Sequence, residues 1–215
     1  MAAMGGPAVE PLTAGALARA TGELAARDPN LAAIVERHGL PPLWERDRGF
    51  ATLVQIVLEQ QVSLASAAAA FERLVAGGPL TPERFLAFDD GDLLAFGFSR
   101  QKARYCRLLA AAIRSGALDL DGLAALDDGA AERALLAQPG IGLWTAAIYL
   151  LMALRRPDVW PASDLALVIA ATEATGRVVR PTPAEMVALA EPWRPWRSVA
   201  ARLLWVDYLG RRGRG

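Results

Sequence analysis

The sequence has one cysteine, one histidine and one lysine among its 215 residues. The single thiol, Cys106, excludes a disulfide within the chain and a four-cysteine zinc or iron–sulfur site. The sequence indicates no serine or cysteine nucleophile paired with a histidine base. It also contains no cluster of metal-ligating residues. We interpret the lone histidine, His38, as a residue at the end of a helix.

Long apolar runs, repeats and low-complexity segments are absent as well. No apolar stretch reaches the length needed to cross a bilayer, and residues 1–10 lack the basic start and apolar stretch of a secretory signal. We therefore expect a cytoplasmic protein that makes no membrane contact. Hydrophobic residues make up 53% of the chain, which argues against disorder, and the length suits one large core or two packed lobes.

The chain has no net charge, because 23 basic residues balance 23 acidic ones. The charges are nevertheless unevenly distributed along the sequence. Residues 97–115 carry five basic and no acidic side chains, and the segment from Arg177 onward carries eight arginines against three acidic residues. Each basic segment is compatible with a solvated helix face or with a surface that binds a polyanion.

Helical periodicity dominates what is present, with alanine and leucine abundant and no alternating strand pattern. The pattern predicts an all-α fold. The expected helices cover residues 13–27, 30–39, 49–60, 64–76, 82–86, 90–95, 100–115, 120–125, 130–138, 143–155, 164–175, 183–190 and 195–209.

The segment Leu135–Asp164 contains a Pro-Gly-Ile-Gly turn between two helical patterns. Pro139 and Gly140 break the first pattern, and the second resumes at Leu143, which is typical of a short helical hairpin. Gly140 and Gly142 lack a Cβ, so they can adopt positive φ and let a partner approach the backbone. The amides that open the second helix would then form an anion site that fits a DNA phosphate. Taken alone, the turn is equally an ordinary connection between helices.

Asp164 ends the Pro-Ala-Ser-Asp sequence about twenty residues after the hairpin, at the start of a helical pattern. An aspartate in this place is an ordinary helix N-cap. A carboxylate held at a helix N-terminus could also stabilise positive charge on a reacting group and could orient or deprotonate a water molecule. The two interpretations are compatible.

Three further segments stand out beside the hairpin. Phe50–Ser66 is an apolar helical pattern that ends in Gln-Gln-Val-Ser, Gly97–Ala103 has the sequence GFSRQKA, and Glu191–Trp205 has the sequence EPWRPWRSVAARLLW. With the hairpin and Asp164, these segments resemble the helix-hairpin-helix DNA glycosylase superfamily, and more closely its AlkA-type 3-methyladenine glycosylases. The resemblance covers residues 50–205.

The resemblance implies a two-lobed, all-α fold with the active-site cleft between the lobes and without an N-terminal β-domain. One lobe would be discontinuous, made of residues 1–50 and 158–215, and would carry the catalytic Asp164. The other would comprise residues 51–157 and carry the helix-hairpin-helix. In this family the hairpin binds the DNA backbone, a role that falls here on Gly140, Gly142 and the amide of Thr145.

Two tryptophans take on roles through the resemblance. Trp144 follows the hairpin where relatives that also cleave the strand carry a nucleophilic lysine, so the resemblance implies a monofunctional enzyme with Trp144 as a wall of the base pocket. Trp205 would stack on the extruded base. Core packing is the alternative for both, and we interpret Trp193 and Trp196 as core residues.

The remaining motifs imply further contacts with DNA. Gln60 and Gln61 are the candidates for the wedge that fills the gap left by the extruded nucleotide, although an amide pair satisfying backbone groups is the alternative. The family usually has a small residue where this chain has Glu59, which leaves the local electrostatics open. Arg100 and Lys102 could contact phosphate.

Relatives hold a cation through main-chain oxygens of the hairpin, which here would be those of Leu136, Gln138 and Ile141. The resemblance implies no required cofactor, and the hairpin could bind a structural monovalent or divalent cation. The partner implied is double-stranded DNA containing damaged bases, bound by a monomer.

The expected reaction is hydrolysis of the N-glycosidic bond of alkylated bases such as 3-methyladenine and 7-methylguanine. An alkylated purine is cationic and leaves readily, and an electron-rich indole attracts it. The alternatives are a glycosylase for deaminated or mispaired bases such as uracil and a non-catalytic protein that binds DNA lesions.

Overall fold

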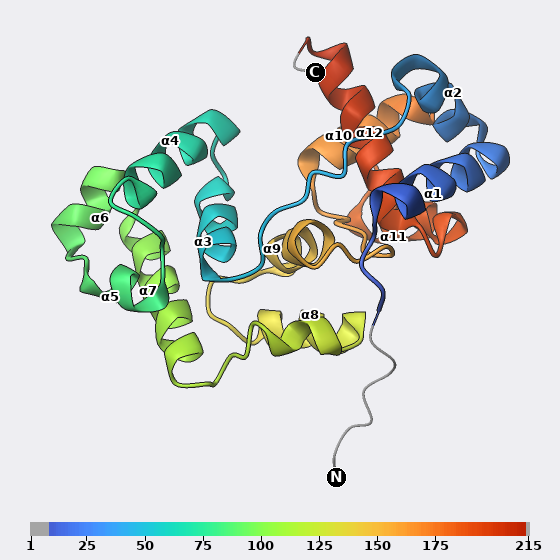
Figure 1. Ribbon diagram of the computed structural model, residues 1–215. Helices are drawn as coiled ribbons and strands as arrows, with labels where there is room; N and C mark the ends of the chain where they lie inside the picture. The colour runs from blue at the N-terminus through green and yellow to red at the C-terminus, as the bar shows by residue number, and fades with distance from the viewer. Residues whose placement is uncertain (1–8, 214–215) are drawn as a thin grey trace. The chain divides into compact units, whose positions relative to one another are not determined.

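The computed structural model describes residues 9–213. This part of the chain contains no β-strand, so the all-α prediction is confirmed (Figure 1). None of the helices described in it is both long and apolar enough to span a membrane. The α-helices are α1 (Ala14–Arg27), α2 (Pro29–His38), α3 (Phe50–Glu59), α4 (Leu64–Val75), α5 (Pro82–Ala87), α6 (Asp90–Phe96), α7 (Arg100–Arg114), α8 (Asp128–Leu136), α9 (Leu143–Ile148), α10 (Leu165–Ala174), α11 (Pro183–Ala190) and α12 (Arg197–Arg211).

Three short helices of other types complete the list. They are the 3-10 helices η1 (Gly122–Ala125) and η3 (Glu191–Trp193) and the π-helix η2 (Tyr149–Ala153). The sequence pattern predicts a single helix over residues 143–155, whereas the structure changes from α to π geometry after Ile148. Side-chain bonds hold this segment, since the Tyr149 hydroxyl accepts from the Gly49 amide at 3.0 Å and Arg202 donates to the Leu151 carbonyl at 3.0 Å.

The chain forms two compact units. The first consists of residues 46–149, and the second combines residues 10–45 with the chain from residue 150 onward.

Helix α3 is the centre of the first unit. It packs against α4, α7 and α9, and its side chains Leu53, Val54 and Ile56 are completely buried. At its start, Phe50 makes an edge-to-face contact with Phe85 of α5 at 5.7 Å between ring centroids. The Gln-Gln sequence that ends α3 is therefore attached to a rigid, buried helix.

Helix α12 has the corresponding place in the second unit, where it packs against α1, α2 and α10 (Figure 1). It buries a charged side chain, Arg202, whose guanidinium donates to the carbonyls of Leu43, Ser198 and Leu151 at 2.8 to 3.0 Å. Burial lowers the pKa of Arg202 to about 10, so the group is still protonated at neutral pH. One buried cation thus joins α12 to two other segments.

Most of the described α-helices begin with a side chain that caps the first turn. Thr81, Ser99 and Thr182 each accept a backbone amide as the N-cap of α5, α7 and α11. The cap of α10 is Asp164 itself. The sequence pattern thus locates the start of the helix that carries the candidate catalytic residue to within one residue.

Candidate active site and nucleic-acid interface

The helical hairpin lies in the first unit, with α8 and α9 joined by residues 137–142. Gly140 has a φ of +85°, and a Cβ added to it would lie 2.3 Å from Cγ of Tyr105. Both the backbone conformation and the close approach of Tyr105 therefore require glycine at this position.

Gly142 differs from Gly140. It is the N-cap of α9 with a φ of −98°, and a Cβ built there would meet no atom within 4 Å. Neither backbone strain nor internal packing demands a glycine. The residue is exposed beside the first-turn amides of α9, which have no acceptor within the helix.

Gln60 holds the hairpin from the end of α3. Its side-chain amide donates to the Gly140 carbonyl at 3.1 Å and to the Thr145 hydroxyl at 2.9 Å. Thr145 is 2% exposed, so its hydroxyl serves the hairpin rather than a surface open to a ligand. The structure therefore favours the alternative role for Gln60, in which its amide satisfies neighbouring polar groups of the hairpin.

Gln61 has a different environment. It is exposed and has a φ of +58°, an uncommon conformation for a residue with a side chain. Val62 and Leu64 follow it with 46% and 66% of their surface exposed. The turn between α3 and α4 therefore presents an amide flanked by two apolar side chains.

Glu59 forms an ion pair that the sequence did not indicate. Both its carboxylate oxygens accept from Arg46 at 3.0 Å, and the Glu59 side chain is 8% exposed. Paired in this bidentate way, the carboxylate does not leave an uncompensated negative charge next to the two glutamines. The negative charge of Glu59 is thus neutralised by Arg46, which lies 13 positions earlier in the chain.

Lys102 and Arg100 lie in the first turn of α7 but differ in their contacts. The Lys102 ammonium donates to the carbonyls of Leu58 and Gln60 at 2.7 and 2.8 Å. It thereby occupies the C-terminal end of α3 rather than a surface open to phosphate, and desolvation lowers its pKa. Arg100 is exposed at the first position of α7.

The proposed cation ligands lie in and next to the turn of the hairpin. The Gln138 carbonyl accepts the Ile141 amide at 3.1 Å, so this oxygen already takes part in the turn. A carbonyl has a second lone pair, which leaves it able to bind a cation together with the carbonyls of Leu136 and Ile141. No group of three or more His, Cys, Asp or Glu side chains within the described residues is placed to hold a metal ion.

Asp164 lies in the second unit, as the N-cap of α10. Its Oδ1 accepts the Leu167 amide at 2.8 Å and the indole N–H of Trp205 at 3.0 Å. Two donors on one carboxylate oxygen fix the orientation of the carboxylate. The structure thus joins two residues that the resemblance assigned separately to catalysis and to base stacking.

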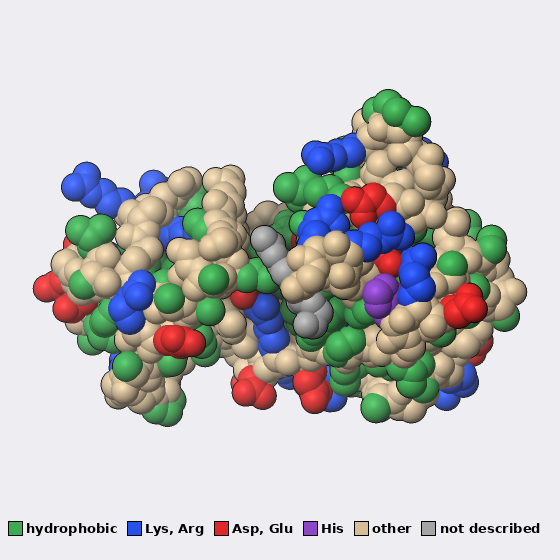
Figure 2. All heavy atoms as spheres, turned by 90° about the horizontal axis from the view of Figure 1, so that it is seen from above, with side chains coloured by type: hydrophobic (Ala, Val, Ile, Leu, Met, Phe, Trp, Pro, Cys, Tyr) green, Lys and Arg blue, Asp and Glu red, His purple; other side chains and the backbone are tan. Residues whose placement is uncertain are grey.

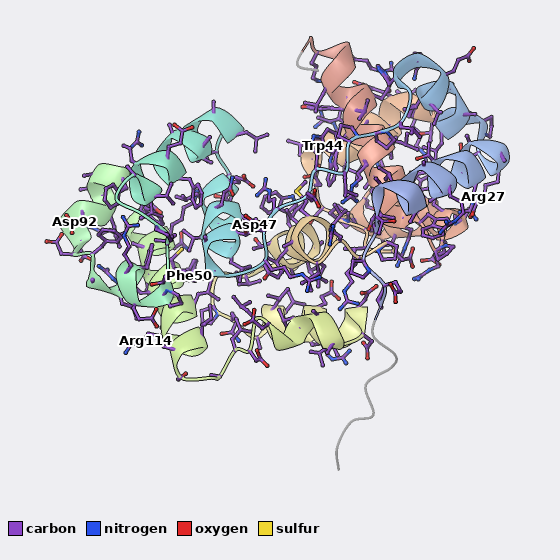
Figure 3. All side chains as sticks on the ribbon, in the orientation of Figure 1. Arg27, Trp44, Asp47, Phe50, Asp92 and Arg114 are labelled. Atoms are coloured by element: carbon purple, nitrogen blue, oxygen red, sulfur yellow. The ribbon has the colours of Figure 1, made fainter. Side chains whose placement is uncertain are left out.

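Trp205 itself is 8% exposed and makes an edge-to-face contact with Trp44, with 6.3 Å between ring centroids and 65° between ring planes. Figure 3 labels Trp44 on the irregular segment that follows α2. Trp44 lies outside every sequence motif and was not predicted as a site residue. A bulky aromatic residue in a polar, proline-containing connection is the only sequence signal it gives.

The other tryptophans vary in burial. Trp144 is half-buried on α9 of the first unit. Trp193 is 3% exposed, which confirms it as a core residue, and its indole N–H donates to Asp28 at 2.7 Å. Trp196 is only half-buried and donates to Glu23 at 2.6 Å, so its assignment to the core was wrong.

His38 is the last residue of α2, as predicted. It contacts Asp207 of α12 at 3.1 Å, and Arg37 and Arg211 bind the same carboxylate at 2.9 and 2.7 Å. Asp207 is completely buried, and Figure 2 shows the histidine among basic side chains on the surface. This cluster stabilises the second unit and was not visible in the sequence.

A family model described as "HhH-GPD superfamily base excision DNA repair protein" matches residues 54–195. A relative from Mycobacterium tuberculosis, named "Probable bifunctional transcriptional activator/DNA repair enzyme AlkA", is 36% identical over 169 residues, which cover 71% of this chain and 32% of the relative. The chain therefore spans about a third of the length of that relative.

Solved structures are similar over most of the chain. A DNA-3-methyladenine glycosidase from Bacillus halodurans is 28% identical with a TM-score of 0.76, covering 90% of this chain and 91% of that one. A 3-methyladenine DNA glycosylase from Schizosaccharomyces pombe, solved in complex with abasic DNA, is 27% identical with a TM-score of 0.71, covering 87% and 95%.

Proposed function

The chain belongs to the HhH-GPD superfamily of base excision DNA repair proteins, and we propose that it is a glycosylase that hydrolyses the N-glycosidic bond of alkylated bases in duplex DNA. The observation that carries the proposal is the carboxylate of Asp164, held by a helix N-terminus and by the indole of Trp205. The names of the similar glycosylases support 3-methyladenine as one substrate.

In this proposal Asp164 acts on the extruded nucleotide. As the glycosidic bond breaks, positive charge develops on the deoxyribose, and the fixed carboxylate stabilises it. The carboxylate also orients the attacking water and accepts its proton. A cationic alkylated base departs as a neutral molecule, so the residues need not supply a separate general acid.

Selectivity for alkylated bases follows from the aromatic side chains. An indole attracts a cation above its face by roughly 0.5 to 2 kcal/mol relative to a neutral group. We assign Trp205, whose indole donates to Asp164, to stacking on the base. The resemblance separately implies a base-contacting role for Trp144. A uracil glycosylase would instead need hydrogen bonds to a neutral base.

We further propose that the enzyme leaves the abasic strand intact. Strand cleavage by this superfamily requires an amine that attacks the sugar, and Trp144 stands at the position where such a lysine would follow the hairpin. The only lysine, Lys102, donates to two main-chain carbonyls of the first unit. Its ammonium group is therefore engaged in holding α3.

Duplex DNA containing damaged bases is the proposed partner. The exposed Gly142 lets a phosphate approach the first-turn amides of α9, including that of Thr145, and Arg100 adds a positive charge. Gln61 is the proposed wedge, because its side chain is exposed whereas that of Gln60 is bound to the hairpin.

Further details are proposals of the same kind. The carbonyls of Leu136, Gln138 and Ile141 would hold a structural cation, and no other cofactor takes part in the reaction. The hairpin lies in the first unit and Asp164 in the second, so both units are required for activity. The monomeric state and the cytoplasmic location stay predictions.

The experiment is a base-release assay with duplexes that carry either 7-methylguanine or uracil, comparing the wild type with Asp164→Asn. We expect release of 7-methylguanine by the wild type, at least about 100-fold slower release by the variant, and no covalent trapping by borohydride. Preference for uracil would support a deaminated-base glycosylase instead. Binding of lesion DNA without release of any base would support a non-catalytic binder.

A further inference from the structure

Trp44 has an unusual backbone conformation in the second unit. Its φ is +44°, a region that bulky residues rarely occupy. Such a conformation is unfavourable for a residue with a bulky side chain and persists where the surroundings enforce it. The structure therefore holds this indole in one place against the preference of the backbone.

The residues on both sides of Trp44 each contact another part of the chain. The carbonyl of Leu43 accepts from the buried guanidinium of Arg202 at 2.8 Å, and the carboxylate of Glu45 accepts from Arg155 at 3.0 Å. These two contacts come from different parts of the chain. The first fixes the backbone directly before the indole, whereas the second is an ion pair between side chains, with 61% of the Glu45 side chain exposed.

Trp44 is linked to the candidate catalytic residue Asp164 by a single side chain, that of Trp205. Trp44 contacts Trp205 with 65° between the two ring planes, and Trp205 donates to Asp164. Trp44 is half-exposed, unlike the core residue Trp193 with its 3% exposure. Core packing alone does not account for an indole that has an unfavourable backbone conformation, follows the anchored carbonyl of Leu43 and is still accessible.

We infer that Trp44 and Trp205 form an aromatic corner that receives the extruded base, with Trp44 as a second indole wall that determines preference for cationic alkylated bases. The inference rests on the proposed function. A base lying along Trp205 meets the neighbouring wall at an angle, so a delocalised positive charge on the base is attracted by two indoles. A neutral base is stabilised only by the burial of its surface against the two rings.

The test uses Trp44→Leu, which keeps an apolar side chain and removes the aromatic ring, and Trp44→Phe, which retains a ring. For a duplex with 7-methylguanine we expect kcat/KM to fall by about 5- to 30-fold in Trp44→Leu and by less than about 4-fold in Trp44→Phe. The dissociation constant for a duplex with an abasic-site analogue should stay within about twofold, because that duplex offers no base to the corner.

Trp196→Leu is the matched control, since Trp196 is also half-buried and lies outside the corner. An equal loss in this control, or a parallel loss of abasic-duplex binding in Trp44→Leu, would assign Trp44 a purely structural role and overturn the inference. Unchanged kinetics in Trp44→Leu would overturn it as well.

Failure of the proposed function gives a different result. If the wild type releases no 7-methylguanine, the affinities of the wild type and Trp44→Leu for the methylated duplex, each relative to the unmodified duplex, still test the corner. A methylation-dependent affinity that falls by about 5-fold or more in Trp44→Leu supports it. Equal affinity ratios in the two proteins reject it.

Discussion

The indole N–H of Trp205 donates to Oδ1 of Asp164 at 3.0 Å, and the same oxygen accepts the Leu167 amide at 2.8 Å. One donor comes from α12 and the other from the first turn of α10. The orientation of the carboxylate thus depends on the same side chain that we assign to base stacking. A change in the indole should therefore alter the chemical step as well as base binding.

The first prediction concerns Trp205→Phe, which retains an aromatic face and removes the N–H donor. A hydrogen bond to a charged group contributes about 1.5 to 3 kcal/mol. We expect the single-turnover rate of base release to fall by about 10- to 100-fold, with a smaller change in DNA affinity.

Trp193→Phe provides a matched control for this experiment. Trp193 is buried and also donates its indole N–H to an aspartate, Asp28, at 2.7 Å. This variant should lose stability without a comparable loss of the rate per folded molecule. Equal rates for Trp205→Phe and the wild type would show that the indole does not position Asp164.

The second prediction separates the two adjacent glutamines. Gln61→Ala removes an exposed side chain, so the free energy of unfolding should change by less than about 0.5 kcal/mol. If Gln61 fills the gap in the duplex, kcat/KM should fall about 10-fold on a fully paired lesion and less on a lesion in a mismatch, which is easier to extrude. An equal loss on both substrates would contradict the wedge role.

Gln60→Ala should behave in the opposite way. It leaves the Gly140 carbonyl and the Thr145 hydroxyl without the Gln60 amide, and a lost buried hydrogen bond destabilises a protein by about 1 to 3 kcal/mol. Urea unfolding should show this loss. A variant as stable as the wild type would show that the hairpin does not depend on Gln60.

The third prediction contrasts two glycines of the hairpin. Gly140→Ala adds a methyl group 2.3 Å from the Tyr105 ring at a φ of +85°, and we expect it to lower the free energy of unfolding by about 2 kcal/mol or more. Gly142→Ala meets open space at a φ of −98° and should fold normally.

For DNA binding, Gly142→Ala is the informative variant. A methyl group on Gly142 would stand where we propose that phosphate approaches the amides of α9. Fluorescence anisotropy with a lesion duplex should therefore show weaker binding by Gly142→Ala at unchanged stability. Binding as tight as that of the wild type would remove Gly142 from the proposed interface.

Local patterns in the sequence were sufficient to locate most helices and to place Asp164 at a helix start. Periodicity located the helices, and cap chemistry placed Asp164 at a helix start because the side chain and the amide it binds are three residues apart. The π-helical segment after Ile148 was missed, since it depends on hydrogen bonds from other parts of the chain.

The unpredicted parts of the site are contacts between distant residues. Arg46 neutralises Glu59, Lys102 binds the end of α3, and Trp44 meets Trp205 across 161 positions, the difference between the two residue numbers. None of these partners can be identified from the sequence around either residue. They also decide which of two neighbouring candidates is accessible, as for Gln60 and Gln61.

The last prediction concerns stability at high pH and the single thiol. Burial raises the pKa of Cys106 from 9.0 to about 12, and the nearby Lys102 opposes the shift. The unfolded chain ionises this thiol first, so between about pH 9 and 12 the unfolded state binds fewer protons than the folded one. Stability therefore falls as the pH rises through this window.

The contribution can be isolated by comparing the wild type with Cys106→Ala in urea unfolding at pH 7 and pH 10. The cavity left by the missing sulfur changes stability by an amount that is independent of pH, and Lys102 and the other titrating groups are present in both proteins. We expect the wild type to lose roughly 1 kcal/mol more than the variant between the two pH values. Because ionisation of the thiol is coupled to unfolding, a thiol reagent at pH 8 should modify Cys106 only as fast as the protein opens. An identical pH dependence in the two proteins would show that the thiol ionises as readily in the folded state as in the unfolded chain, and that the α7 side of the first unit is open to solvent.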